Sequence, residues 1–232
     1  MSEPFLFLHN YTPMVEQRIS INFNARYYKL GEINKDTVQV WFVLHGYGQL
    51  AQYFIKKFNS LEARRICVIA PEGLSRFYLE DVNSRSQGGS SRVGATWMTK
   101  EDRLTDIENY ITYLNSIYQK EITGLKSIPP VTLLGFSQGV ATAARWALYG
   151  SVDFQRMILW AGILPPDMDF ALGKERVKGK EVIQIYGRLD PFINAERLDE
   201  MKKLSDQLNI APKIIEYDGK HEIDERVLGQ IN

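Results

Sequence analysis

Ser137 lies at the centre of a Gly-x-Ser-x-Gly pattern, in the stretch VTLLGFSQGVATAARWALYG. A serine hydroxyl is a poor nucleophile at neutral pH. It needs a base to take its proton, a group that orients the base, and donors for the oxyanion. Gly135 and Gly139 would let the chain turn sharply from a strand into a helix and project the hydroxyl. The pattern proves little alone, so the rest of the chain must supply these partners.

The chain has three histidines that could act as the base. His9 lies in the N-terminal segment, ahead of the expected core, and suits a surface position. His45, in VLHGYG, ends an apolar run and is expected to hold the following glycine-rich turn by hydrogen bonds. His221 follows the last apolar run and precedes the last helical segment, so we predict that it is the base.

Asp190 is the acid that we expect to orient His221. It follows the run VIQIYGRL and lies between the serine and the histidine in the sequence. The order Ser137, Asp190, His221 resembles that of the α/β-hydrolases and differs from the two orders found in serine proteases. An aspartate before a proline is also a common turn residue. Asp218, in YDGKH, is a rival acid, but it is close to His221 along the chain and fits a turn with Gly219 more simply.

The oxyanion needs two backbone N–H groups as donors. In this arrangement one belongs to the residue after the nucleophile, here Gln138, and the other to the loop that follows an early strand. HGYGQLAQYF fits that loop, and its Tyr47 is flanked by glycines that would let the amide point inward. We therefore predict that the amides of Tyr47 and Gln138 form the oxyanion hole. This role constrains the main chain of the two residues more than their side chains.

The elements that must position these residues follow a repeated pattern. Apolar runs ICVIAPEG, VTLLGFS, MILWAGI, VIQIYGRLD and KIIEYDGKH alternate with helical segments. The helical segments lie at about 50–65, 102–119, 138–149, 194–208 and 222–231. Strands buried on both faces and separated by helices are typical of a mostly parallel α/β sheet with helices on both faces. Functional groups gather at the carboxyl ends of such strands, where each run has a Gly, Pro, Ser, Asp or His.

The N-terminal part and the long connections follow other patterns. RISINFNARYYKLG and TVQVWFVLHGYG, with the turn-forming NKD between them, predict an N-terminal antiparallel hairpin. Residues 74–101 contain SRSQGGSSR, which we expect to be a mobile loop. Neither this connection nor 161–180 is long enough for a folded cap, so no large lid domain is expected.

Length and composition limit the classes of protein to which the chain can belong. The chain has 232 residues, of which 44% are apolar, and no linker, so we expect one domain over 1–232. Positive and negative residues balance at 28 each, which gives no electrostatic reason to expect nucleic acid or an anionic membrane as a partner. Cys67 is the single cysteine, which excludes an intramolecular disulfide. No apolar run approaches the roughly 20 residues that span a bilayer, and no signal-peptide pattern is seen, so we expect cytoplasmic residence without stable membrane insertion.

Five motifs together resemble one family. LHGYGQLAQYF, APEG, GFSQGV, YGRLDPFI and DGKH occur in the order seen in the phospholipase/carboxylesterase group of α/β-hydrolases, which includes acyl-protein thioesterases. The resemblance covers about residues 38–225. It implies a compact hydrolase core, the triad Ser137, Asp190 and His221, and catalysis without a metal or cofactor. GATWMTKEDR is similar to a family segment whose tryptophan lines the acyl pocket, which makes Trp97 a candidate substrate contact; anchoring the core is the alternative.

The sequence also departs from the family pattern. Val140 stands where the family commonly has a third glycine, and the N-terminal hairpin has no equivalent in the smallest thioesterases, which suggests an edge used in a homodimer. The 74–101 connection carries Arg76, Arg85 and Arg92, where an enzyme that depalmitoylates proteins would be expected to offer a more apolar groove. This favours a general esterase over a thioesterase.

The function expected from these features is that of a serine carboxylesterase. It would hydrolyse short- to medium-chain esters of small molecules through an acyl-enzyme intermediate. The alternatives are an acyl-protein thioesterase or a lysophospholipase with the same triad. A rival of another class is a ligand-binding protein that keeps the fold without turnover, although such a protein would have no chemical need for the triad and both oxyanion loops.

Overall fold

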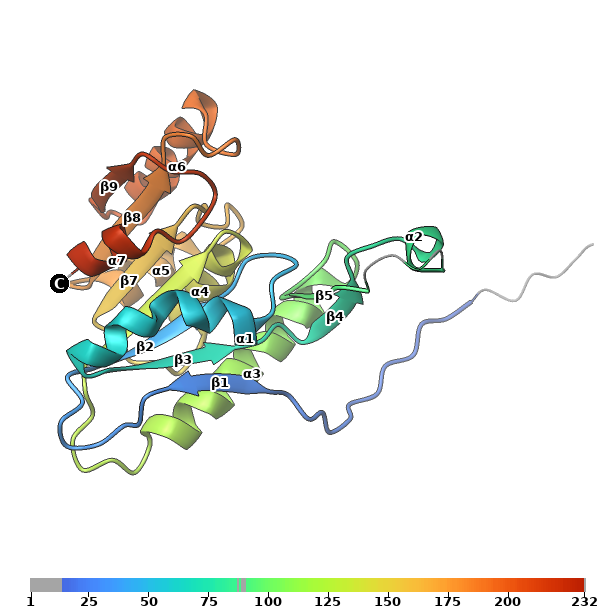
Figure 1. Ribbon diagram of the computed structural model, residues 1–232, viewed down its shortest axis with the longest axis horizontal. Helices are drawn as coiled ribbons and strands as arrows, with labels where there is room; N and C mark the ends of the chain where they lie inside the picture. The colour runs from blue at the N-terminus through green and yellow to red at the C-terminus, as the bar shows by residue number, and fades with distance from the viewer. Residues whose placement is uncertain (1–13, 87, 89–90, 232) are drawn as a thin grey trace, which may run out of the picture.

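The computed structural model describes residues 14–86, 88 and 91–231. Figure 1 shows a central sheet with helices packed against it and a hairpin that projects from one side of the body. The sheet has seven strands in the order β1-β3-β2-β6-β7-β8-β9. Along the chain they are β1 (Tyr27–Leu30), β2 (Gln39–Leu44), β3 (Ile66–Pro71), β6 (Val131–Phe136), β7 (Arg156–Trp160), β8 (Glu181–Gly187) and β9 (Lys213–Tyr217).

The helices fall mostly where the apolar periodicity predicts them. They are α1 (Ala51–Phe54), the 3-10 helix η1 (Ile55–Arg64), α2 (Val82–Ser86), α3 (Arg103–Ile122), α4 (Gln138–Tyr149), α5 (Phe170–Val177), α6 (Ala195–Gln207) and α7 (Glu225–Gln230). The predicted segment 138–149 has the bounds of α4, and the segment 50–65 divides into α1 and η1. Helix α5 lies in the connection 161–180, for which the sequence predicted no helix.

Alternating side chains of β2 point to two separate cores. Val40, Phe42 and Leu44 pack in one core with residues of α3, α4, α5 and α6. Trp41 and Val43 pack on the opposite face with residues of α1, η1 and α7. The strands are therefore buried on both faces, which confirms the predicted mostly parallel α/β sheet with helices on both faces.

Six of the seven strands run parallel, from β3 through β9. Their carboxyl ends consequently lie at one edge of the sheet. Ser137 directly follows β6, Asp190 lies just past β8, and His221 lies just past β9. The fold thus places the three predicted triad residues at the same edge.

The predicted N-terminal hairpin is wrong in its pairing. β1 is antiparallel, but its partner is β3, with Tyr27 opposite Pro71 and Leu30 opposite Val68. Both edges of β2 are already occupied by β3 and β6, so the outer edge of β3 is where a further strand can join. Residues 18–26, which continue the alternating pattern toward the N-terminus, form no strand.

The connection 74–101 contains a β-hairpin, whose strands lie on either side of SRSQGGSSR, the stretch predicted to be a mobile loop. β4 (Ser75–Tyr78) and β5 (Val93–Thr96) form a separate antiparallel sheet, with Ser75 opposite Thr96 and Tyr78 opposite Val93. Helix α2 lies at the far end, and the described residues of 75–96 project from the body as an arm (Figure 1). Of the stretch SRSQGGSSR, residues 87, 89 and 90 lie outside the described residues.

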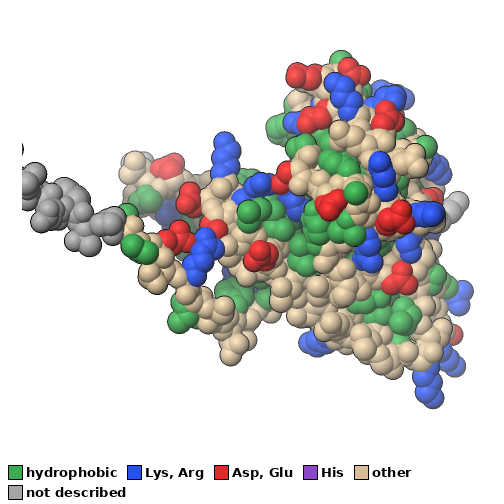
Figure 2. All heavy atoms as spheres, turned by 180° about the vertical axis from the view of Figure 1, so that it is seen from behind, with side chains coloured by type: hydrophobic (Ala, Val, Ile, Leu, Met, Phe, Trp, Pro, Cys, Tyr) green, Lys and Arg blue, Asp and Glu red, His purple; other side chains and the backbone are tan. Residues whose placement is uncertain are grey.

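The surface of the body is mixed in charge. Figure 2 shows basic and acidic side chains interspersed over one face, with no large area of a single sign. None of the helices in the described ranges is long and apolar enough to cross a bilayer. No large lid domain covers the sheet edge within the part of the chain that the structure describes.

Candidate active site

Ser137 lies in a tight turn between the end of β6 and the start of α4. Its φ is 53° and its ψ is −118°, a strained combination for a residue with a side chain and one that clusters at active sites. The Ser137 N–H donates to the Trp160 carbonyl at 2.9 Å, and the Val140 N–H donates to the Ser137 carbonyl at 3.0 Å. These bonds hold the strained turn against β7 and the first turn of α4.

Three glycines allow close packing around this turn. A Cβ added at Gly135 would lie 2.3 Å from the Gly139 carbonyl oxygen, and one at Gly139 would lie 2.1 Å from the Leu44 carbonyl oxygen. A Cβ at Gly162, just past β7, would lie 2.5 Å from the Ser137 carbonyl oxygen. Side chains at these positions would push the turn out of place. The motif pointed to the first two glycines, whereas Gly162 was not predicted.

Asp190 and His221 are in direct contact. His221 Nδ1 lies 2.6 Å from Asp190 Oδ2. The Asp190 side chain is buried, and its other oxygen, Oδ1, accepts a hydrogen bond from the Phe192 N–H at 2.9 Å. Because a carboxylate only accepts hydrogen bonds, Nδ1 carries the proton in this contact and Nε2 is left as an acceptor.

The imidazole of His221 lies beside the turn that carries Ser137. Its ring centroid is 4.9 Å from that of Phe136 and 4.8 Å from that of Phe192. Phe136 directly precedes the serine. The structure shows no hydrogen bond between Ser137 Oγ and His221, both of which it describes. Such bonds are often long before substrate binds and tighten in the complex.

The rival acid, Asp218, lies at the surface. Its side chain is 82% exposed and forms an ion pair with Arg188 at 2.7 Å. Asp190, in contrast, is buried against His221. The structure therefore brings together the acid and the histidine that the sequence order favoured.

His45 holds the turn that follows β2, as predicted. It is fully buried, its Nδ1 lies 2.7 Å from the Gly46 carbonyl oxygen, and its Nε2 accepts a hydrogen bond from the Gly73 N–H at 2.9 Å. This pattern requires the neutral ring with the proton on Nδ1. Burial lowers the pKa of His45 to about 4. His9 lies outside the described residues.

The loop after β2 lies against the nucleophile. A Cβ added at Gly46 would lie 3.2 Å from the Cβ of Ser137. The Gly46 N–H donates to the Gln49 side chain at 2.8 Å, whereas the amides of Tyr47 and Gln138 donate to no described residue. These two amides therefore have no hydrogen-bond acceptor among the described residues. The Tyr47 ring is exposed and lies against Phe77, with the ring centroids 5.1 Å apart.

A sequence profile decides the family. The profile described as Phospholipase/Carboxylesterase matches residues 32–232. The chain belongs to the phospholipase/carboxylesterase family. No curated protein sequence matches it.

Solved structures of other α/β-hydrolases have the same fold as this family member. Zea mays acyl-protein thioesterase 2 is similar over 90% of this chain and 96% of its own, with a TM-score of 0.63 and 14% identity. A Bacillus cereus carboxylesterase is similar over 89% of this chain and 91% of its own, with a TM-score of 0.61 and 15% identity. Esterase PE8 is similar over 90% of this chain and 100% of its own, with a TM-score of 0.59 and 18% identity. At these identities the likeness shows the fold alone.

Trp97 lies in the core beneath the loop after β2. Its side chain is buried, its indole N–H donates to the His45 carbonyl at 2.8 Å, and its ring centroid is 4.9 Å from that of His45. This is the placement that the core-anchoring alternative expects. Trp97 supports the segment that carries the Tyr47 amide.

A cavity of about 680 Å³ opens beside His221. Its walls come from the segment that contains α1 and η1, from the arm, and from the loop after β9. Such a volume is in the range of small-molecule sites. The apolar lining residues are Leu50, Phe54, Leu79, Val93, Phe136 and Ile223, and the charged ones are Lys57, Arg92 and Glu222.

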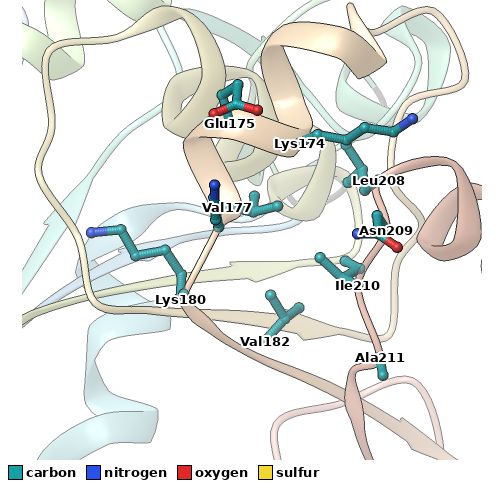
Figure 3. Close-up of a pocket in the computed structure, with 11 residues that line it drawn as sticks. Lys174, Glu175, Val177, Lys180, Val182, Leu208, Asn209, Ile210 and Ala211 are labelled. Carbon is teal, nitrogen blue, oxygen red and sulfur yellow. The ribbon is translucent and has the colours of Figure 1, made fainter.

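A second cavity, of about 510 Å³, lies between α5, the start of β8 and the loop after α6. Figure 3 shows Lys174 and Lys180 extending away from the apolar side chains of Val177, Val182 and Ile210. It lies where β8 begins, whereas Asp190 follows the other end of that strand. This cavity therefore belongs to the edge of the sheet opposite the triad.

Proposed function

We propose that this chain is a serine carboxylesterase that hydrolyses short- to medium-chain carboxylic esters. The observation that carries the proposal is the contact of 2.6 Å between His221 Nδ1 and buried Asp190, beside the strained turn of Ser137. Membership of the phospholipase/carboxylesterase family supports a hydrolase of this general type. Cytoplasmic residence stays a prediction from the sequence.

The proposed mechanism uses groups of the chain and water. His221 Nε2 takes the proton of Ser137 as Oγ attacks the ester carbonyl carbon, and Asp190 holds the proton on Nδ1. The carbonyl electrons move to oxygen, and the Tyr47 and Gln138 amides donate to that oxyanion. When the C–O bond breaks, His221 gives its proton to the leaving alcohol, and the acyl group stays on Ser137. Water that gives its proton to His221 then attacks the acyl-enzyme, which releases the acid and restores the serine.

The cavity beside His221 supports a short or medium acyl group. The cavity has a volume of about 680 Å³. Its lining is partly apolar, but Lys57, Arg92 and Glu222 also line it. A long acyl chain of a thioester or lysophospholipid would have to pass these charges, at a cost in desolvation. The acyl-protein thioesterase and lysophospholipase alternatives therefore rank second. A ligand-binding protein without turnover would have no chemical need for the strained serine.

The first test is hydrolysis of p-nitrophenyl esters from acetate to palmitate. We expect the highest kcat/KM on short and medium esters and a loss of about 10⁴-fold or more in Ser137→Ala. Ser116→Ala is the matched control, because Ser116 lies on the exposed face of α3 and donates to the Thr112 carbonyl there. A preference for palmitate would favour the lipid alternatives. Equal activity of Ser137→Ala and wild type would reject the triad.

Residues 18–26 support a homodimer. Ile19, Ile21 and Phe23 are 88%, 74% and 57% exposed on an extended stretch that joins no strand in the described ranges. In the stretch RISINFNAR, apolar and polar residues alternate between two terminal arginines, so the order of residue types is the same from either end. Two antiparallel copies centred on Asn22 would set Ile21 opposite Phe23 and Ile19 opposite Ala25, with every apolar side chain on one face. We propose that two copies of the chain pair through this segment.

A further inference from the structure

The root of the arm, which we define as residues 94–98, is bonded to the loop that carries Tyr47. The Gly48 N–H donates to the Ala95 carbonyl at 2.9 Å, and the Ala95 N–H donates to the Gln49 carbonyl at 3.2 Å. These bonds make residues 48 and 49 an added partner of β5. The Tyr47 amide, which directly precedes this pairing, is therefore positioned by the arm.

The same root is bonded to the side chain of Gln138. Gln138 Nε2 donates to Thr96 Oγ1 at 3.0 Å and to the Met98 carbonyl at 3.1 Å, and its Oε1 accepts from the Trp97 N–H at 3.2 Å. Thr96 Oγ1 donates to the Met98 carbonyl at 2.9 Å. With this assignment both protons of the Gln138 amide and the proton of the buried Thr96 hydroxyl are used.

Close backbone contacts leave the root little room to move. A Cβ added at Gly94 would lie 2.4 Å from the Gly48 carbonyl oxygen. A Cβ added at Gly73 would lie 2.5 Å from the Thr96 carbonyl oxygen. The loops after β2 and β3 thus pack directly on β5. A shift of β5 would move the loop that carries Tyr47 and, through the bonds from Thr96 and Trp97, the side chain of Gln138.

We propose that Thr96 is a positioning residue for ester hydrolysis, which fixes the Gln138 amide through the Gln138 side chain. The inference rests on the proposed function. Oxyanion donors act only when they are held at the right distance from the developing charge. That charge exists in the transition state and not in the bound ester, so loss of alignment should lower kcat and leave KM nearly unchanged. The arm also lines the cavity beside His221 through Leu79, Arg92 and Val93, so one hairpin borders both this cavity and the segments of the proposed donors.

The test compares Thr96→Val with Thr96→Ser. Valine keeps the shape of threonine but has no hydroxyl, so we expect kcat to fall by about 10- to 100-fold with KM within about 2-fold of wild type. Serine keeps the hydroxyl and should restore kcat to within about 3-fold of wild type. Thr132→Val is the matched control, because Thr132 is a buried threonine near the amino end of β6, and it should keep the wild-type kcat.

An inhibitor and a second variant separate a positioning role of Thr96 from a general loss of stability. A boronic acid that mimics the tetrahedral intermediate should lose affinity for Thr96→Val by the same factor as kcat/KM, which a general loss of stability would not produce. If Thr96→Val does not fold, Gln138→Glu replaces it, because a carboxylate cannot donate to Met98 and should give the same loss of kcat. Wild-type kcat in a folded variant of either kind would overturn the role of Thr96. Absence of ester hydrolysis in the wild type would instead reject the proposed function.

Discussion

At the scale of residues, the site depends most on how Asp190 holds His221. The Asp190 side chain is 0% exposed and that of His221 is 22% exposed, so water has little access to the contact between them. The second carboxylate oxygen is bonded to the Phe192 N–H, which fixes the plane of the carboxylate. Phe136 and Phe192 lie against the imidazole ring. These contacts favour the ring orientation and the tautomer that the proposed mechanism needs, with Nε2 left as an acceptor.

Asp190→Asn is expected to lower kcat by about 10³- to 10⁴-fold. The carboxamide keeps the size of the side chain, but its NH2 group can face Nδ1 of His221 and favour the tautomer that cannot accept the serine proton. Asp218→Asn is the matched control, since Asp218 contacts Arg188 at the surface, and should stay within about 2-fold of wild type. Steady-state hydrolysis of the best p-nitrophenyl ester measures both variants. Equal losses in the two would contradict the assignment of Asp190.

The contact between Asp190 and His221 could be predicted from the sequence because each residue follows a recognisable strand. The roles of Gly162 and Thr96 could not, since they depend on distances between segments that are remote along the chain. Gly162 approaches the Ser137 carbonyl across two loops, and Thr96 meets Gln138 only because the end of β5 lies against the start of α4. For Trp97 the sequence left two roles open, and burial beside His45 fits the anchoring one.

At the scale of elements, local pattern predicted the strands and helices better than their partners. The alternation in residues 18–30 does favour extended chain, yet only β1 finds a neighbour, and that neighbour is β3. Pairing depends on which strand edges remain free, and a sequence of alternating residues does not reveal that. The sequence did not predict the arm for a different reason. Its strands β4 and β5 are only four residues each, which is too short for a clear alternating pattern.

Segment 18–26, which joins no strand in the described ranges, gives a prediction about assembly. Ile21→Lys would put a charge on the apolar face of the proposed two-copy pairing, so we expect it to shift the protein from dimer to monomer. Ser20→Lys is the matched control, because Ser20 lies on the opposite, polar face of the extended stretch, and it should remain a dimer. Light scattering coupled to size-exclusion chromatography measures the mass of each variant. A monomeric wild type at the concentrations tested would reject the pairing.

At the scale of the whole molecule, the parallel sheet could be predicted because its strands are buried on both faces. Each apolar run supplies side chains to the two cores in turn, which leaves a nearly continuous hydrophobic pattern in the sequence. One domain over residues 1–232 stays a prediction. The balance of 28 positive and 28 negative residues carries no information about a substrate, so specificity must come from the loops at the sheet edge.

His45 connects three of those loops, and we expect its titration to make the stability of the molecule depend on pH. It bonds Gly46 and Gly73, and the Trp97 indole bonds its carbonyl. Desolvation by burial lowers the pKa of His45 from 6.5 to about 4, partly opposed by the bond to Gly46 and by the charge of Glu72. In the unfolded chain the pKa returns to its ordinary value. Between these two values the unfolded state therefore binds more protons than the folded state.

The neutral imidazole thus contributes stability that is complete above about pH 6.5 and is lost as the pH falls toward 4, by an amount on the order of 3 kcal/mol. Urea unfolding at several pH values from 7 to 5 should show about 2 kcal/mol of this loss. His45→Gln removes the titrating group and retains a side-chain acceptor, so it should be less stable at pH 7 but lose less stability on acidification. Both proteins have the same surface carboxylates. The difference between them in how the free energy of unfolding changes with pH therefore reports on His45 alone. An equal slope in His45→Gln and wild type would mean that the three loops are not held through a buried, neutral histidine.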